Sequence, residues 1–242
     1  MLFVANALAE EAAEEVIEEA AEESVSWLSQ AFGKFAEFPV WGWVLVAVLL
    51  IGGVIAWRRI RGTQKTIWTT KMVSLGAICL ALTCVLSMIK LFRMPNGGSV
   101  TPASMLPLML FAYVYGVGPG LVLGAIYGML DFALGGWFLS VPQFLMDYPV
   151  AFAMCGLAGL FRKNSDVRLG LSLGVVVGSL GRYIAAVAAG VLFWSDLTEG
   201  LAPALIYSLG YNGTYMAVEC VICVVISILM GERLVKELKK VA

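Results

Sequence analysis

The chain has 242 residues, 60% of them hydrophobic, and a formal net charge of −1 at pH 7. With a mean hydropathy of +0.89, this composition excludes an ordinary water-soluble globular domain. A net charge near zero gives no support to nucleic-acid binding. The sequence has no histidine, which removes the usual general base, proton shuttle and metal ligand.

The first 70 residues differ from the rest of the chain. Residues 1–39 carry glutamates at four-residue spacing, from Glu10 to Glu23, which predicts an acidic extracytoplasmic extension that is helical or partly disordered. No basic segment precedes a hydrophobic run there, so a signal peptide is not predicted. Residues 40–57 are apolar between tryptophans and predict an additional transmembrane anchor, and residues 58–70 form a basic cytoplasmic linker.

Seven apolar stretches in all are long enough, or nearly so, to cross a bilayer. Glycine, proline or charged residues separate them. The sequence therefore predicts an all-α polytopic membrane protein with a six-helix core over residues 71–230, one extra N-terminal transmembrane helix and a basic cytoplasmic tail over 231–242. The expected spans are 40–57, 71–92, 103–118, 120–136, 143–161, 169–193 and 202–230.

Basic residues are segregated among the loops. With seven spans, twelve of them fall on one side, which the positive-inside rule assigns to the cytoplasm. We therefore expect a multi-pass protein of the cell membrane with its N-terminus outside and its C-terminus inside. The twelve are Arg58, Arg59, Arg61, Lys65, Lys71, Arg162, Lys163, Arg168, Arg233, Lys236, Lys239 and Lys240.

Two isolated carboxylates indicate a functional site. Between Thr101 and Leu160 the only charged residues are Asp131 and Asp147. An ionised carboxylate in hydrocarbon is costly unless a cavity, partner or cationic ligand offsets the cost. Polar and aromatic residues are expected with Asp147 near the outer ends of the spans, and Arg182 deeper. The candidate binding residues are Trp137, Gln143, Asp147, Tyr148, Arg182, Trp194, Tyr207 and Asn212.

A carboxylate, an amide and several aromatic faces suit a cationic heteroaromatic ligand. Two structural alternatives are an interfacial aromatic belt and an ion pair between Asp147 and Arg182. The sequence has no Walker A motif and no nucleophile–base set, so we predict a transport subunit and not an enzyme. We predict neither a cofactor nor a metal site, because the Cys220–Cys223 pair has no second ligand pair and favours simple packing.

Small residues at four-residue spacing allow helices to approach closely in a membrane. Gly120, Gly124 and Gly128 form one such set, and Gly174 and Gly178 form another. Ala77 and Ala81 give the second span a similar small face. The glycine sets indicate helix packing, whereas the Ala77–Ala81 face is explained either by internal packing or by docking of a partner subunit.

Three segments resemble the thiamine-binding S components of energy-coupling factor transporters. They are KLFRMPNGGSVTPASMLP (Lys90 to Pro107), QFLMDYPVAFAMCGLAGLF (Gln143 to Phe161), and GVLFW followed by YSLGYNGTY (Gly190 to Trp194, Tyr207 to Tyr215). The resemblance covers about residues 70–230. It implies a six-helix substrate-binding membrane subunit, which works with a transmembrane coupling subunit and two ATPases.

The resemblance also implies roles for individual residues. Asp147, beside Tyr148, matches the pyrimidine-binding acid, and Trp137 and Trp194 match the aromatics on the thiazolium side. Tyr207, Asn212 and Arg182 match further binding positions, and Ala77 and Ala81 lie on the helix that docks on the coupling subunit. The sequence departs from the family at Ala186, where histidine is usual, and in the loop from Pro95 to Thr101, which lacks an aromatic residue.

The leading hypothesis is therefore an S component that takes up thiamine. One alternative is an S component for a related pyrimidine, a thiamine precursor or another vitamin, which the departure at Ala186 makes reasonable. A second is a stand-alone secondary carrier with Asp147 as its ion site, although the sequence shows no clear inverted repeat. Dependence of uptake on ATPase subunits separates these classes.

Overall fold

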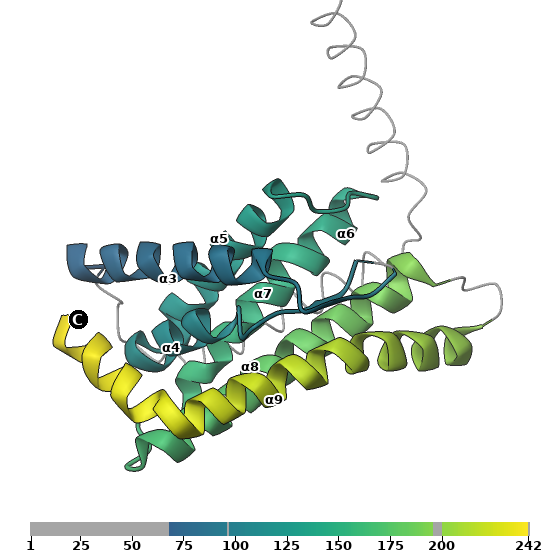
Figure 1. The fold of residues 1–242 in the computed structure, drawn as a ribbon. Coiled ribbons are helices and arrows are strands. Elements are labelled where there is room, and N and C mark those ends of the chain that lie inside the picture. The colour runs from purple at the N-terminus through teal and green to yellow at the C-terminus, as the bar shows by residue number, and fades with distance from the viewer. Residues whose placement is uncertain (1–67, 96, 196–199, 242) are drawn as a thin grey trace, which may run out of the picture.

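The computed structural model describes residues 68–95, 97–195 and 200–241. The predicted acidic extension, the first apolar span and nearly all of the basic linker lie outside the described residues. The described chain forms a bundle of helices with one short hairpin (Figure 1).

The bundle contains six helical segments in chain order. The first three are α3 (Thr70–Met88), α4 (Leu106–Tyr115) and α5 (Val117–Ala133). A fourth, interrupted segment comprises α6 (Val141–Leu145), η1 (Met146–Val150), α7 (Ala151–Ala153) and η2 (Met154–Phe161). The fifth joins α8 (Val167–Ala189) to η3 (Gly190–Trp194), and the sixth is α9 (Leu201–Val241). Strands β1 (Phe92–Arg93) and β2 (Ser99–Val100) pair antiparallel between α3 and α4.

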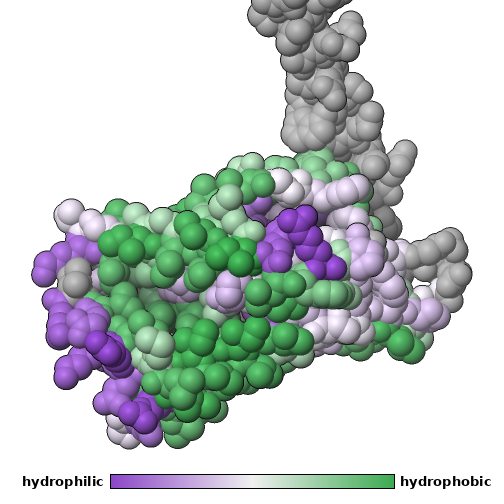
Figure 2. Space-filling view, in the orientation of Figure 1, coloured by the Kyte–Doolittle hydropathy of each residue, from purple (hydrophilic) through white to green (hydrophobic). Residues whose placement is uncertain are grey.

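All six segments are apolar, and most of them have the length of a membrane span. Four of them, beginning with α3, α6, α8 and α9, are long and apolar enough to cross a bilayer, and α4 and α5 are shorter apolar helices. Large hydrophobic side chains such as Ile78, Ile184 and Ile206 are exposed on the outside. Hydrophilic residues gather at the end of the bundle that holds the C-terminus (Figure 2). The prediction of a helical, polytopic membrane protein is confirmed.

Helix α4 forms the centre of the bundle. Every residue from Leu106 to Tyr113 is buried, and α3, α5, η2, α8 and α9 all pack against this helix. Phe111 and Tyr113 are among the largest fully buried side chains. A helix that is apolar on all faces is expected at such a position. The neighbouring helices α8 and α9 run side by side and antiparallel along the bundle (Figure 1).

The glycines of α5 allow its backbone to touch the interrupted segment. Gly120 lies against Gly156, Gly124 against the carbonyl of Phe152, and Gly128 against the carbonyl of Tyr148. A Cβ at Gly124 would lie 2.9 Å from the Cα of Ala153. These contacts agree with the helix packing that the spacing of the glycines predicts.

Two boundaries differ from the sequence prediction. The predicted break at residues 118–120 lies instead at Gly116, whose φ of 98° separates α4 from α5. Pro119 falls in the first turn of α5, where a missing backbone N–H costs little. At the other end of the chain, α9 continues without interruption through the predicted tail to Val241.

Candidate functional site

Two irregular helical turns carry the central residues of the candidate site. Asp147 and Tyr148 lie in η1, a π-helical turn that contains Pro149, and Trp194 ends η3, a second π-helical turn. Short π-helical insertions are frequent at functional sites because they redirect side chains that a regular α-helix would point elsewhere. Here they bring an acidic and an aromatic side chain together from two different segments.

The Asp147 carboxylate is held by two donors. Gln143 donates from Nε2 to Oδ2 at 2.6 Å, and Trp194 donates from Nε1 to the same oxygen at 3.0 Å. Gln143 is fully buried, and its own Oε1 accepts a hydrogen bond from the backbone N–H of Leu139 at 3.0 Å. The Gln143 amide therefore has a fixed orientation, which in turn orients Asp147.

Trp137 and Tyr148 continue this cluster. The backbone N–H of Trp137 donates to the Tyr148 hydroxyl at 2.6 Å, and the rings of Trp137 and Trp194 lie 6.4 Å apart, edge to face. The indole of Trp137 is 67% exposed and that of Trp194 is 39% exposed. Large aromatic surface is thus available next to a half-buried carboxylate. The aromatic faces suit a cation, and the carboxylate suits a hydrogen-bond donor.

Asn212 lies on the adjoining face of α9. Its Nδ2 donates to the Ser208 carbonyl at 3.0 Å and approaches the Ala186 carbonyl at 3.5 Å, while its Oδ1 accepts from Tyr215 at 2.8 Å. Gly190, at the start of η3, packs against the same Ser208 and Asn212 side chains. Asn212 therefore supports the turn that ends in Trp194.

Tyr207 lies one turn before Tyr211 on α9. The two rings stack 6.0 Å apart, and Tyr207 is 50% exposed. The Tyr211 hydroxyl accepts a hydrogen bond from the backbone N–H of Gly98 at 3.1 Å. This contact fixes the hairpin loop on α9.

Arg182 does not join the Asp147 cluster. The alternative of an Asp147–Arg182 ion pair is wrong for the described residues, because Arg182 turns toward α9 and lies 3.8 Å from the carboxylate of Glu219. The sequence prediction did not name Glu219. The signal was nevertheless present, since Glu219 is an isolated carboxylate in the apolar span 202–230, and the argument applied to Asp147 applies equally to it.

Ala77 and Ala81 lie on the outside of α3. Both residues are exposed, whereas their neighbour Gly76 is buried against Leu123 and Phe111. The pair is thus free of the internal core and faces lipid or a partner.

These features define a class: a polytopic helical membrane protein with an acidic and aromatic cluster at one end of its bundle. The chain also matches the family described as "Thiamine transporter protein (Thia_YuaJ)" over residues 73–239, and it belongs to that family.

Individual relatives agree with the family match. The chain is similar to "Thiamine transporter ThiT" of Bacillus subtilis, with 38% identity over 148 residues, covering 57% of this chain and 77% of the relative. It is 28% identical over 136 residues to "Thiamine transporter ThiT" of Lacticaseibacillus paracasei, covering 50% of this chain and 68% of that protein. The solved structure of ThiT from Listeria monocytogenes superposes with a TM-score of 0.56 at 26% identity, covering 70% of this chain and 96% of that one.

Proposed function

We propose that the protein binds thiamine at the outer face of the cell membrane as the substrate-binding subunit of an ATP-driven energy-coupling factor transporter. The observation that carries this proposal is the Asp147 carboxylate, held on one oxygen by Gln143 and Trp194 beside exposed aromatic rings. Membership of a thiamine transporter family supports the choice of ligand.

The chemistry of the cluster matches the two rings of thiamine. The amino group of its pyrimidine is a hydrogen-bond donor, for which the Asp147 carboxylate is the acceptor. The thiazolium ring carries the positive charge, and the indoles of Trp137 and Trp194 hold it by cation–π attraction. Tyr148, Tyr207 and Asn212 complete the proposed site, with Arg182 a helical turn below Ala186.

The orientation follows from the basic residues. Within the described chain, eight lysines and arginines belong to the start of α3, the turn from η2 into α8 and the last part of α9, which lie at the end of the bundle away from α6 (Figure 1), whereas Lys90 and Arg93 belong to the region of the hairpin. The positive-inside rule places the first group in the cytoplasm. The ligand site then faces outward, the N-terminus lies outside and α9 ends inside the cell.

Transport requires energy from partners in this proposal. The sequence contains no Walker A motif, so we expect ATP to be hydrolysed by two ATPase subunits that act through a transmembrane coupling subunit. The exposed face with Ala77 and Ala81 is the proposed docking surface for the coupling subunit.

Binding and uptake assays test the proposal. The purified protein is titrated with thiamine and with free aminopyrimidine, and cellular uptake of thiamine is measured with and without the ATPase subunits. We expect saturable thiamine binding and uptake that requires the ATPases. Tighter binding of the free pyrimidine would favour a precursor transporter, and uptake independent of the ATPases would favour a stand-alone carrier.

A further inference from the structure

A buried ion pair lies beneath the proposed ligand site. The Nη1 atom of Arg182 on α8 is 3.8 Å from Oε2 of Glu219 on α9. The side chains are 13% and 5% exposed, respectively. Removing one partner of such a pair leaves an uncompensated charge in a medium of low dielectric constant.

The surroundings of the pair hold both groups in place. Glu219 accepts hydrogen bonds from Thr101 and from Ser104, the latter at 3.0 Å. The Arg182 guanidinium lies 4.3 Å from the centroid of the Phe152 ring, and its Nη1 is 2.8 Å from the sulfur of Met105.

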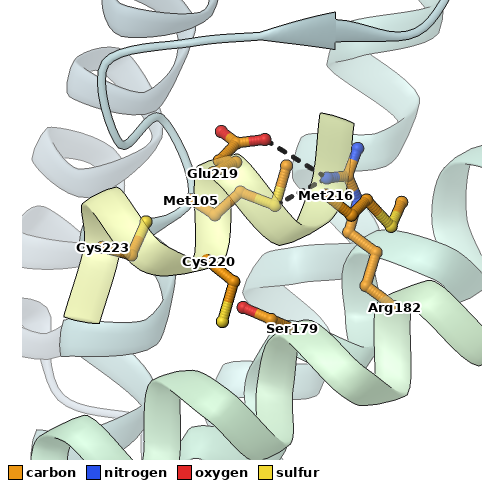
Figure 3. A pocket seen from close by; sticks show the side chains of 7 residues that line it. All are labelled: Met105, Ser179, Arg182, Met216, Glu219, Cys220 and Cys223. Atoms are coloured by element: carbon orange, nitrogen blue, oxygen red, sulfur yellow. Dashed lines mark hydrogen bonds and ion pairs between the residues drawn. The ribbon is translucent and has the colours of Figure 1, made fainter. Parts of the chain in front are cut away.

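A small cavity lies beside the pair (Figure 3). Its volume is about 10 Å³, room for about one water molecule, and Ser179, Arg182, Met216 and Glu219 are among its lining residues. The Nε atom of Arg182 is buried without a hydrogen-bond partner among the described residues. The Arg182 charge is therefore offset mainly by Glu219, and not by solvent.

Arg182 lies on the helical segment that ends in Trp194, twelve residues before that tryptophan. Arg182 precedes Ala186 by one turn of α8, a rise of about 6 Å, and the Ala186 carbonyl approaches the side chain of Asn212. Among the described residues, Asp131 is a further carboxylate within electrostatic reach of Arg182, but the ion pair of Arg182 is with Glu219, and Asp131 accepts a hydrogen bond from the Tyr127 hydroxyl at 3.2 Å. An uncompensated guanidinium here would repel a thiazolium ring, because charges interact strongly where water does not screen them.

We propose that Glu219 determines the charge selectivity of the ligand site: by neutralising Arg182, it allows this end of the bundle to accept a cation. This inference rests on the proposed function. In this proposal Glu219 makes no contact with the ligand. It affects ligand binding through Arg182, whose charge it neutralises. The competing explanation is that Glu219 serves only to fasten Thr101 and Ser104.

Two probes separate these explanations. One is thiamine, and the other is its neutral isostere, in which a thiophene ring replaces the thiazolium. The measured quantity is the ratio of the two dissociation constants, determined for each purified variant. If Glu219 only anchors Thr101 and Ser104, its loss should weaken the binding of both probes equally. If it neutralises Arg182, its loss should weaken the binding of the cationic probe only.

Three variants and one control complete the experiment. Glu219→Gln is expected to weaken thiamine relative to the neutral probe by about tenfold or more, since it retains the shape but removes the charge. Arg182→Met is expected to strengthen the binding of thiamine relative to that of the neutral probe. The double variant Arg182→Met/Glu219→Gln should return the ratio to within about threefold of the parent, because neither charge remains. The control is Glu232→Gln. Glu232 lies on α9, like Glu219, and forms an exposed ion pair with Arg168 of α8, so its loss should leave the ratio unchanged.

The outcomes distinguish a failure of the Glu219 inference from a failure of the proposed function. The role of Glu219 is overturned if the ratio is unchanged in Glu219→Gln. It is also overturned if the ratio in the double variant is shifted as far as in Glu219→Gln. Should Glu219→Gln not fold, Arg182→Met decides, and an unchanged ratio in that variant overturns the inference. A parent protein that does not bind thiamine refutes the proposed function, and this inference falls with it.

Discussion

The indole N–H of Trp194 meets the carboxylate of Asp147 at 3.0 Å, across a separation of 47 residues in the sequence. Gln143 donates to the same oxygen, Oδ2, and Oδ1 accepts no hydrogen bond from the described residues. One oxygen is thus used to position the carboxylate while the other is available to a ligand. A carboxylate fixed in advance loses little conformational entropy on binding.

Thiamine binding is expected to quench tryptophan fluorescence. Trp137 and Trp194 are the proposed ligand contacts, so the quench should shrink in Trp137→Phe and Trp194→Phe. Trp68→Phe is the matched control, because Trp68 lies next to the first turn of α3 at the opposite end of the bundle. Fluorescence titration of the four proteins checks this. A quench that depends on Trp68 and not on Trp194 would contradict the proposed site.

Asp147→Asn should weaken thiamine binding far more than Asp131→Asn. The change preserves the shape of the side chain but replaces the carboxylate that is proposed to accept a hydrogen bond from the pyrimidine amino group. The expected loss of binding free energy is about 2–4 kcal/mol for a desolvated contact. Asp131 lies in α5 and bonds to Tyr127, outside the Asp147 cluster. Calorimetric titration of both variants provides the comparison. Equal affinities in the two would show that Asp147 has a structural role only.

Gly124→Ala should lower the stability of the bundle. The new methyl group would meet the backbone of Phe152 and Ala153, and overpacking of this kind costs about 1–3 kcal/mol. Gly210→Ala is the control, since a Cβ there meets nothing within 4 Å and alanine favours a helix. Thermal unfolding in detergent should show a lower midpoint for the first variant and an unchanged or higher one for the second. The reverse order would contradict the packing of α5.

Replacing Ala77 and Ala81 together by Trp should abolish uptake and copurification with the coupling subunit. A close helix crossing tolerates no bulk on its small face. Thiamine binding should survive, because both alanines are exposed and lie outside the ligand cluster. The control is Ile78→Trp/Leu82→Trp, which alters the adjacent exposed face of the same helix. If this control variant alone lost uptake, the docking surface would lie on that face.

The sequence was sufficient to predict the helical membrane fold and to identify Asp147 as a candidate site residue. Hydropathy locates long apolar spans, and a lone carboxylate within one is conspicuous. The π-helical turns at η1 and η3 could not be predicted, because they depend on packing between distant segments. The break at Gly116 was missed because Pro119 appeared to be the stronger helix breaker, although proline is tolerated in a first turn.

Arg182 illustrates a further limit of sequence reasoning. Its isolated charge was recognised, but the choice between Asp147 and Glu219 as its partner depends on which way the side chain leaves α8. Helix periodicity alone does not show whether the Arg182 side chain points toward Asp147 or toward Glu219. In the structure, the packing of α8 along α9 directs the guanidinium toward Glu219.

The length of α9 makes it a rigid indicator of how the bundle sits in the bilayer. Its 41 residues extend for about 60 Å, roughly twice the thickness of the hydrocarbon layer. The same continuous helix therefore carries Asn212 beside the proposed ligand site and, in the proposed orientation, Lys236 and Lys240 in the cytoplasm. A 10° change in the inclination of the bundle would displace the far end of α9 sideways by about 10 Å relative to its start. An orientation-sensitive spectroscopic label at Lys240 would convert the inclination of the whole subunit into a measurable angle to the membrane normal.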